Sequence, residues 1–377
     1  MTSDRIRRLP AYPFAEIEKK ISERKNKGKD VISFAIGDPD LEVPEFIVNE
    51  ASRAMKERAG QSYPSSEGEL FFREAVSEWY RKRFKVSLDP EREVIALIGS
   101  KEGIANISRA FIDRGDRVLV PDPGYPVYSQ GATILCDGIV QPFLLREENG
   151  FLPDTESIEG KAKMMFFSYP NNPTGAVAKI EDFREIADFC DDRGILACHD
   201  NAYSEITFDG FEAPSFLQCS MNGVEFHSLS KTFNMTGFRI GFCAGNEEII
   251  KALKMVKSQI DSGPSIFVQR AAAKALDAYS SSERPECVMN NVRTYEKRRD
   301  LLYKGLSGIG IDCKLPKGTF YLWVKAKDGS KFAEELLEKD VAVTPGAGFG
   351  NEGEQYVRFA LTQPENRISD ALRRLGA

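Results

Sequence analysis

The feature that most constrains the fold is an alternation of short apolar runs with segments of helical periodicity through the middle of the chain. Short apolar runs predict buried strands, and amphipathic stretches between them predict helices that cover a sheet. Strands separated by helices are typical of a mostly parallel sheet covered on both faces. The predicted strands are 94–98, 117–120, 163–168, 195–199, 224–229 and 239–244, and the predicted helices are 101–112, 180–192, 247–261 and 264–279.

The pattern changes near residue 285. A long charged helix is predicted there, followed by a mixture of short strands and one short helix, which is typical of an α+β unit. The predicted elements of this part are 287–305, 319–324, 329–339, 341–344 and 355–361. A helix at 13–28 and a strand at 31–35 are expected to pack with it. We therefore predict a large α/β domain at 46–284 and a small α+β domain formed by 1–45 and 285–377.

Composition narrows the class of protein. The 51 basic and 57 acidic residues give a formal charge of −6, which argues against a nucleic-acid or anionic-membrane partner. No apolar run approaches the ~18 residues of a membrane span. The N-terminus lacks a signal-peptide core, and the seven cysteines include no Cys-x-x-Cys pair. We expect a cytoplasmic enzyme, and with only two histidines we expect no metal site.

One lysine suggests the chemistry. Lys231 follows the apolar run 224–229 and is flanked by hydroxyl side chains, with Arg239 eight residues further on. A desolvated lysine with a lowered pKa can condense with an aldehyde, and hydroxyls with an arginine suit a phosphate. A lysine imine combined with a phosphate site is how proteins hold pyridoxal 5′-phosphate (PLP). A lone lysine in a Ser/Thr loop would more often be a surface residue, so the prediction depends on the rest of the chain.

Other polar residues follow the predicted strands, where ligands bind in open α/β sheets. The turn 99–103 begins a helix whose exposed N–H groups could hold a phosphate. Tyr125, fixed between prolines, could stack on a flat ring. Each pattern alone is also explained by an ordinary turn, which is the more frequent case.

Two more strand ends carry sharper signals. Asn172 and Tyr203 could both bond a phenolate oxygen of the cofactor. Asp200 follows the strand 195–199, and a buried carboxylate there would keep a pyridine nitrogen protonated. A protonated ring acts as an electron sink for a carbanion. Turn chemistry at the asparagines and a helix N-cap at Asp200 are the alternatives without functional meaning.

Taken together, these motifs resemble a known family. Asn-Asn-Pro-Thr-Gly at 171–175, Asp-x-x-Tyr at 200–203 and Ser-x-Ser-Lys at 228–231 occur in an order and spacing similar to class I/II aminotransferases of the fold type I PLP superfamily. The resemblance extends along nearly the whole chain. It implies a large domain with a mostly parallel sheet, a smaller α+β domain, and PLP as the cofactor.

The resemblance also assigns roles around the cofactor. Lys231 would bind it covalently, with Asp200 on the pyridine nitrogen. Asn172 and Tyr203 would face the phenolate oxygen, and Tyr125 would stack on the ring. The positions matched to the phosphate are Ser100, Lys101 through its backbone N–H, Ser228, Ser230 and Arg239.

On the substrate side, Arg358 matches the arginine that binds the α-carboxylate, and Gly37 and Asn172 match contacts near it. A guanidinium fork suits a carboxylate in a way that a lysine does not. Tyr63 matches a tyrosine that reaches the phosphate of the neighbouring subunit. The resemblance therefore implies a homodimer with shared active sites and a ping-pong reaction between an amino acid and a 2-oxo acid.

A further motif is misleading. Residues 348–353 read Gly-x-Gly-x-x-Gly, which occurs in dinucleotide-binding proteins between a strand and a helix. Here it precedes a predicted strand, 355–361, so we interpret it as a glycine-rich loop near the substrate entrance.

The stretches 98–104, 120–128 and 198–206 are most similar to LL-diaminopimelate aminotransferases, which form glutamate from 2-oxoglutarate in lysine biosynthesis. One departure is Ser66, where a tyrosine or glutamate is expected; Glu67 is an alternative acidic contact for a distal ammonium. Aspartate- or alanine-type aminotransferases and a PLP-dependent C–S β-lyase stay open as alternatives. A non-catalytic regulator is disfavoured, because about 30 residues precede the first predicted strand.

Overall fold

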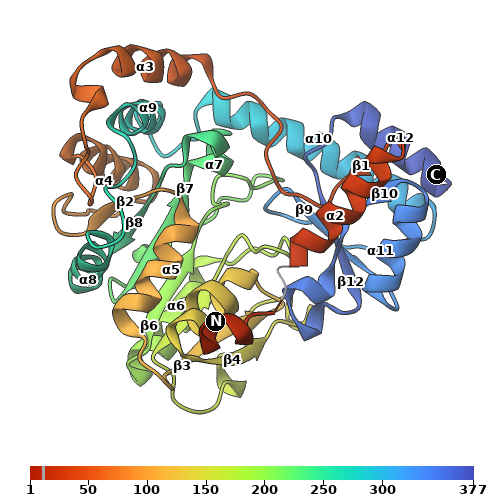
Figure 1. Cartoon of the computed structure of the whole chain (residues 1–377), viewed down its shortest axis with the longest axis horizontal. Coiled ribbons are helices and arrows are strands. Elements are labelled where there is room, and N and C mark those ends of the chain that lie inside the picture. Colours follow the sequence, from red (N-terminus) through yellow and green to blue (C-terminus); the bar gives the residue numbers. More distant parts are fainter. Residues whose placement is uncertain (11–12) are drawn as a thin grey trace.

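The computed structural model describes residues 1–10 and 13–377. Its elements gather around a large sheet and a smaller group of strands, joined by a long helix (Figure 1). The large sheet has seven strands in the order β2-β8-β7-β6-β5-β3-β4. These strands are β2 (Val94–Leu97), β3 (Arg117–Asp122), β4 (Ile139–Leu144), β5 (Met164–Phe167), β6 (Leu196–Asp200), β7 (Gly223–Ser228) and β8 (Gly241–Gly245).

The large sheet is mixed because of β8. Strands β7, β6, β5, β3 and β4 pair in parallel, whereas β8 runs antiparallel to both of its neighbours, β7 and β2. Only the short helix α7 (Leu229–Thr232) and a three-residue 3-10 helix (Thr236–Phe238) lie between β7 and β8. A connection this short lacks the long helix of a typical crossover, and the chain returns in the opposite direction. The prediction of a mostly parallel sheet is confirmed.

Alternation along the strands explains why both faces of this sheet are covered. On β5, Met164 and Phe166 belong to the apolar core on one face, and Met165 and Phe167 to the core on the other. Helices α5 (Ser100–Phe111) and α8 (Glu247–Lys257) supply the first face. The second face is covered by α4 (Leu70–Phe84), α6 (Ile180–Arg193) and α9 (Ile266–Leu276), and α3 (Glu45–Lys56) packs on α9.

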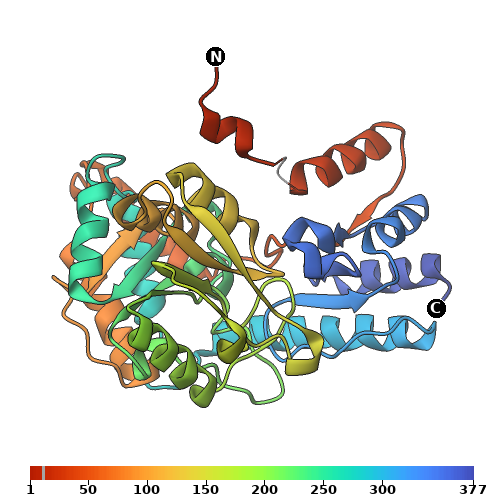
Figure 2. The same ribbon diagram turned by 90° about the horizontal axis from the view of Figure 1, so that it is seen from below.

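The smaller group of elements has its own core. It contains an antiparallel sheet in the order β11-β12-β9 and a parallel pair of β1 with β10. Figures 1 and 2 show its helices on the outside of these strands. Its elements are α2 (Pro13–Asn26), β1 (Ile32–Ser33), α10 (Glu286–Gly308), β9 (Tyr321–Lys325), α11 (Gly329–Glu338), β10 (Val341–Ala342), β11 (Thr344–Pro345), β12 (Tyr356–Ala360) and α12 (Glu365–Leu375).

The N-terminal segment joins the C-terminal elements rather than the large sheet. Ile32 pairs with Val341 and Ser33 with Ala342. Ile17 and Ile21 of α2 pack with Leu337 in a separate apolar cluster. The short helix α1 (Asp4–Arg8) lies instead against the large part, where Arg8 contacts Asp137.

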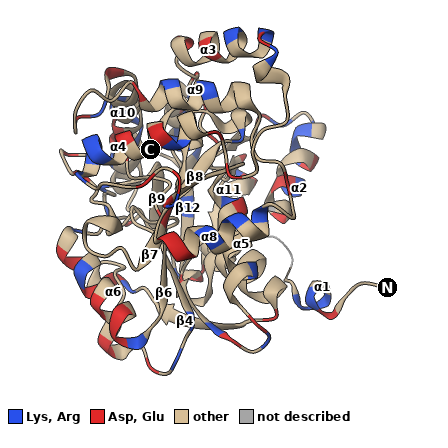
Figure 3. Cartoon of the chain, turned by 90° about the vertical axis from the view of Figure 1, so that its left-hand side faces the viewer, with Lys and Arg blue, Asp and Glu red and all other residues tan. Residues whose placement is uncertain are grey.

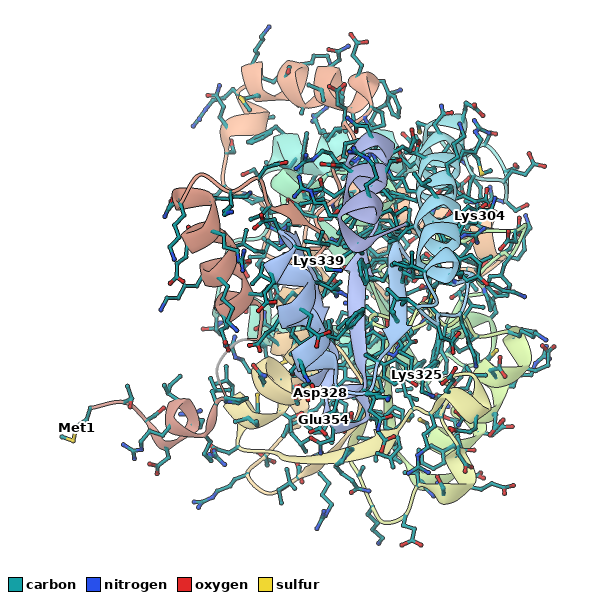
Figure 4. The ribbon with its side chains drawn as sticks, turned by 90° about the vertical axis from the view of Figure 1, so that its right-hand side faces the viewer. Met1, Lys304, Lys325, Asp328, Lys339 and Glu354 are labelled. Carbon is teal, nitrogen blue, oxygen red and sulfur yellow. The ribbon has the colours of Figure 1, made fainter. Side chains whose placement is uncertain are left out.

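Charged side chains tie the two parts together near the end of β9. Glu147, which follows β4, lies 2.7 Å from Lys325 Nζ and 3.1 Å from Lys314 Nζ. Tyr356 donates a third hydrogen bond, of 3.1 Å, to the same carboxylate. Figure 4 shows Lys325 at the end of the small sheet, beside Asp328 and Glu354. This carboxylate therefore bridges the two parts.

Some elements differ from the sequence-based expectation. The edge strand β4 was not predicted, because it carries Pro142 and its side chains are mostly exposed or half-buried. Helices α3, α4 and α12 were not predicted either. The predicted strand 341–344 is two short strands, β10 and β11, which pair with different partners.

Within residues 1–10 and 13–377, no helix combines the length and apolar character needed to cross a bilayer. Figure 3 shows acidic and basic residues interspersed along α3, α4 and α6. The same described residues hold no group of three or more His, Cys, Asp or Glu placed to bind a metal ion.

Candidate active site

The predicted site residues converge at one edge of the large sheet. Strands β6 and β7 are parallel neighbours and end at Asp200 and Ser228. Lys231 lies one turn beyond Ser228, in α7. Because the carboxyl ends of parallel strands meet at the same edge, these residues lie close together. Asp200 and Lys231 are close enough to interact electrostatically: the charge of Lys231 lowers the pKa of Asp200, and the charge of Asp200 raises the pKa of Lys231.

Lys231 has the environment expected of a nucleophilic amine. Its Nζ donates a 3.1 Å hydrogen bond to the carbonyl of Gly37, which belongs to the small part of the chain. Burial lowers the pKa of Lys231 to about 8, with the charges of Arg358 and Arg239 acting in the same direction and that of Asp38 against them. About a tenth of the amine is then neutral at pH 7, against less than a thousandth for an ordinary lysine. The neutral amine is the form of a lysine that acts as a nucleophile.

Asp200 is buried and keeps one oxygen without a partner. Its Oδ2 accepts a 2.7 Å hydrogen bond from Tyr128, while its Oδ1 is buried and has no hydrogen-bond partner. Burial raises the pKa of Asp200 to about 6, and the Tyr128 hydrogen bond opposes that increase. Buried acceptors are rarely left unsatisfied, so this oxygen suits a cationic N–H donor from a bound ligand. A protonated pyridine nitrogen is such a donor, and the site therefore fits PLP.

Tyr128 is a functional neighbour that the sequence reasoning did not single out. Its ring is 1% exposed and stacks on Phe166, with ring centroids 5.2 Å apart and an interplanar angle of 7°. Tyr125 lies edge-to-face against Tyr128, at 5.7 Å, and is half-buried. The sequence signal that could have identified Tyr128 is its distance of three residues from Tyr125, which places both rings on the same face of a helical turn.

Strand register brings the predicted phosphate residues together. Gly241, at the start of β8, pairs with Leu97 on one side and with Ser228 on the other. The turn after β2 therefore lies beside the turn after β7, with Arg239 just before β8. The phosphate-side residues Ser100, Lys101, Ser228, Ser230 and Arg239 all fall on these three segments.

This turn also has the shape of an anion cradle. Arg239 donates hydrogen bonds to the carbonyls of Ile98 (3.2 Å) and Thr236 (2.8 Å). Gly99 has φ of 115°, and a Cβ there would lie 2.8 Å from the Arg239 guanidinium. The backbone conformation favours glycine here, and the absence of a side chain lets the Arg239 guanidinium lie close to the turn. Helix α5 begins at the next residue, Ser100, with its N–H groups directed at the cradle.

The small part of the chain contributes Arg358. It lies on β12, 2% exposed, and donates to Asn172 Oδ1 at 2.8 Å and to the carbonyl of Ala35 at 3.0 Å. Its guanidinium lies 4.1 Å from the centre of the Tyr321 ring and 4.8 Å from that of Phe349. The guanidinium is thereby fixed in orientation beside the Asn-Asn-Pro-Thr-Gly turn.

Gly37 and Tyr203 both meet Tyr321, another residue that the sequence reasoning missed. A Cβ on Gly37 would lie 2.0 Å from Tyr321 Oη, so that only glycine fits. The hydroxyls of Tyr203 and Tyr321 are 3.0 Å apart, and burial raises the pKa of Tyr203 well above that of a free phenol. Tyr321 therefore links the predicted cofactor residue Tyr203 to the predicted substrate residue Gly37.

Three predicted residues lie toward solvent. Lys101 and Arg239 are exposed, as expected of a cradle open to a ligand. Tyr63 is 92% exposed, which leaves its side chain accessible to a second chain. Glu67, offered above as a contact for a distal ammonium, is instead paired with Lys254 at 2.8 Å and Arg73 at 3.3 Å in its own chain.

The glycine-rich loop 348–353 supports the substrate side. As the sequence indicated, the element that follows it is a strand, β12, rather than a helix. The Asp122 carboxylate accepts hydrogen bonds from the backbone N–H groups of Asn351 (3.1 Å) and Glu352 (3.0 Å). These contacts hold the loop, and with it Phe349, beside Arg358.

Comparison with known proteins decides the family. Residues 29–375 match the family described as aminotransferase class I and II. The chain belongs to this family. The protein is therefore a PLP-dependent aminotransferase, which moves an amino group between amino acids and 2-oxo acids.

Several relatives of this aminotransferase are similar over nearly the full length. The chain is 50% identical to the LL-diaminopimelate aminotransferase of Desulforudis audaxviator, over 98% of this chain and 96% of the relative. It is 47% identical to the enzyme of the same name from Moorella thermoacetica, over 98% and 96%. Among solved structures, substrate-bound BacF from Bacillus subtilis superimposes with a TM-score of 0.93 at 34% identity, over 100% and 97% of the two chains. The Thermus thermophilus aspartate aminotransferase with maleate gives 0.92 at 30% identity, over 100% and 98%.

Proposed function

We propose that this aminotransferase takes LL-diaminopimelate as its amino donor and 2-oxoglutarate as its acceptor, in lysine biosynthesis. The observation that carries the proposal is the 42–50% identity to several LL-diaminopimelate aminotransferases over nearly the whole chain. The similarity to aspartate aminotransferase structures is lower, at 30%. That similarity makes aspartate the second candidate donor.

The roles of the side chains are also proposals, and they follow from the contacts above. Bound PLP supplies an electron sink that lets the substrate Cα lose its proton. Lys231, with its pKa of about 8, accepts that proton at Nζ and returns it to a neighbouring carbon. The free oxygen of Asp200 holds the pyridine nitrogen protonated. Arg358 orients the substrate carboxylate through its guanidinium fork.

The remaining cofactor residues have supporting roles. We assign Tyr125 to stacking on the ring, and Asn172 and Tyr203 to its phenolate oxygen. Ser100, Lys101, Ser228, Ser230 and Arg239 form the phosphate cradle. Gly37 contributes a backbone contact close to Arg358, supported by its position against Tyr321.

We further propose a cytoplasmic homodimer in which Tyr63 completes the phosphate site of the partner subunit. The nearly complete exposure of Tyr63 supports this, as do exposed apolar side chains on α3, Val48 and Met55. The division into domains at 46–284 and at 1–45 with 285–377 is supported by the seven-stranded sheet and by the separate core of the smaller group of strands, while the first helix, α1, packs on the large domain. Active sites would then lie between the domains and between subunits.

The donor is tested by mixing the PLP-loaded enzyme, one at a time and without acceptor, with LL-diaminopimelate, aspartate or alanine. We expect the visible absorption of the cofactor to shift fully with LL-diaminopimelate and slowly with the others. An unchanged spectrum with LL-diaminopimelate and a rapid shift with aspartate would select the second candidate. In a separate assay with a cysteine thioether and 2-oxoglutarate, release of pyruvate and ammonia instead of a new amino acid would indicate a lyase.

The dimer is tested by co-expressing Lys231→Ala and Tyr63→Ala chains with different tags. In a mixed dimer, one site carries both changes and the other carries neither. We expect the purified mixed dimer to regain close to half of the normal activity, while each variant alone stays impaired. A mixed dimer no more active than its parents would contradict the shared site.

A further inference from the structure

Behind the phosphate cradle lies a buried lysine that the proposed reaction does not use. Lys257, the last residue of α8, has a fully buried side chain. Its Nζ lies 3.1 Å from Glu102 Oε2 and 2.7 Å from Asp261 Oδ1. A fully buried ammonium is costly unless it is paired, so this lysine is retained together with its two carboxylates.

Glu102 connects this lysine to the cradle. It stands in the first turn of α5, and its Oε2 accepts a 3.1 Å hydrogen bond from the backbone N–H of Ile98. The carbonyl of the same Ile98 accepts the hydrogen bond from Arg239. Both backbone polar groups of Ile98 are therefore held, its N–H by Glu102 and its carbonyl by Arg239. The Gly99 turn is fixed between them.

The charge of Glu102 needs compensation at this place. A carboxylate in the first turn of α5 shares the helix N-terminus with the anion that the cradle is proposed to bind. Two anions at one helix start repel each other, and burial strengthens the repulsion. The Glu102 carboxylate is mostly buried, and that burial raises its pKa, while Lys257 acts in the opposite direction.

We propose that Glu102 and Lys257 are positioning residues for the cofactor phosphate. Glu102 holds the Ile98 peptide so that the Gly99 turn keeps its shape, and Lys257 neutralises Glu102 so that a dianionic phosphate is accepted at the start of α5. This inference rests on the proposed phosphate site. Asp261 has a different task, since it accepts from the N–H of Gly263 (2.6 Å) and ties Lys257 to that turn.

The experiment compares two cofactors that differ only in the phosphate. Apoenzyme is titrated with PLP and with pyridoxal, and the dissociation constant of each is measured from the absorbance of the bound ligand. We expect Lys257→Met to weaken PLP binding about tenfold and pyridoxal binding less than about twofold. Adding Glu102→Gln to Lys257→Met should restore PLP binding to within about threefold of the unmodified chain.

Lys254→Met is the matched control. Lys254 lies one turn earlier on α8 and pairs with Glu67 rather than with the cradle. We expect it to leave both dissociation constants unchanged. If Lys257→Met weakens both ligands equally, or neither, the proposal is overturned. A general loss of packing would raise the dissociation constants of PLP and pyridoxal alike, whereas a loss at the phosphate site raises only that of PLP.

A second pair of variants keeps the test valid if Lys257→Met does not fold. Glu102→Gln retains an oxygen acceptor for the Ile98 N–H, whereas Glu102→Ala does not. We expect only Glu102→Ala to weaken PLP more than pyridoxal; equal behaviour of the two variants would overturn the proposal. Arg239→Gln tests the phosphate site itself. If Arg239→Gln weakens PLP and pyridoxal equally, or neither, the proposed phosphate site is refuted, whatever the result for Glu102 and Lys257.

Discussion

The two charged centres of the site differ in how they are held. Asp200, on the large sheet, is buried with one hydrogen bond and one free oxygen. Arg358, on the small sheet, is held by Asn172 of the large part and by Ala35 of the N-terminal segment, with aromatic rings on it. The large sheet thus leaves an acceptor for a cofactor, whereas the substrate-binding group depends on contacts between different parts of the chain. Cofactor binding and substrate binding should therefore respond to different substitutions.

The largest effect on activity is expected at Lys231, because this residue is proposed to act on both the cofactor and the substrate. Lys231→Ala removes the amine that binds the cofactor and moves the substrate proton. We expect the rate of the half-reaction with an amino donor to fall at least about 10³-fold. Single-turnover absorbance measurements on PLP-loaded protein check this. Near-normal turnover would refute the role of Lys231.

Arg358→Lys separates the two centres. A lysine keeps the charge but cannot form the bidentate contact or lie flat between the rings. We expect kcat/KM for the amino donor to fall about 100-fold, with the dissociation constant of PLP changed less than about threefold. Steady-state kinetics and cofactor titration of the same preparation provide both numbers. Equal losses in kcat/KM and in PLP affinity would show that substrate binding and cofactor binding do not depend on separate centres.

Tyr128→Phe acts on the opposite centre. It removes the hydrogen bond that lowers the pKa of Asp200, so this pKa should rise above about 6. We expect PLP affinity to fall about tenfold near pH 6.5 and to approach the normal value near pH 8.5, where Asp200 is again ionised. An equal loss of affinity at both pH values would show that Tyr128 acts only through packing.

The same carboxyl has a consequence for stability. Its pKa in the folded chain lies above the ordinary value of 3.8, so its contribution to apoenzyme stability is full below that value and is lost as pH rises through about 6. Asp200→Asn should therefore flatten the fall in apoenzyme melting temperature between pH 5 and 7. An unchanged slope would contradict the burial of an uncompensated charge.

The smallest effect is expected from a substitution at the contact between the large and small parts of the chain. Glu147→Gln weakens the contacts to Lys314, Lys325 and Tyr356, which are partly exposed. Its hydrogen bond with Lys325 lowers the pKa of Glu147 to about 2, so the stabilisation is fully present above about pH 4.5 and is lost as pH falls from there through about 2. We expect a loss of less than about 1 kcal/mol in the free energy of unfolding and less than about threefold in KM, with PLP affinity unchanged. Denaturant unfolding at pH 7 checks the first value.

The sequence predicted the large sheet well because its signals are local. Runs such as 164–167 and 195–198 are continuously apolar and end shortly before Asn172 and Asp200, and the motif order then identified Lys231, Asp200 and Arg358. Strand β4 was missed because an edge strand with Pro142 has no such run. Contacts made across the fold could not be predicted, because they depend on register and on the meeting of the two parts. Tyr321 against Gly37, and Glu67 against Lys254, are the clearest cases.

The most direct test of the account is to find the residue that carries the cofactor. The PLP-loaded enzyme is reduced with borohydride, which makes the bond between lysine and cofactor permanent, and is then digested and analysed by mass spectrometry. We expect the modified peptide to contain Lys231. A cofactor attached to another lysine, such as the neighbouring Lys101 of the cradle, would contradict it.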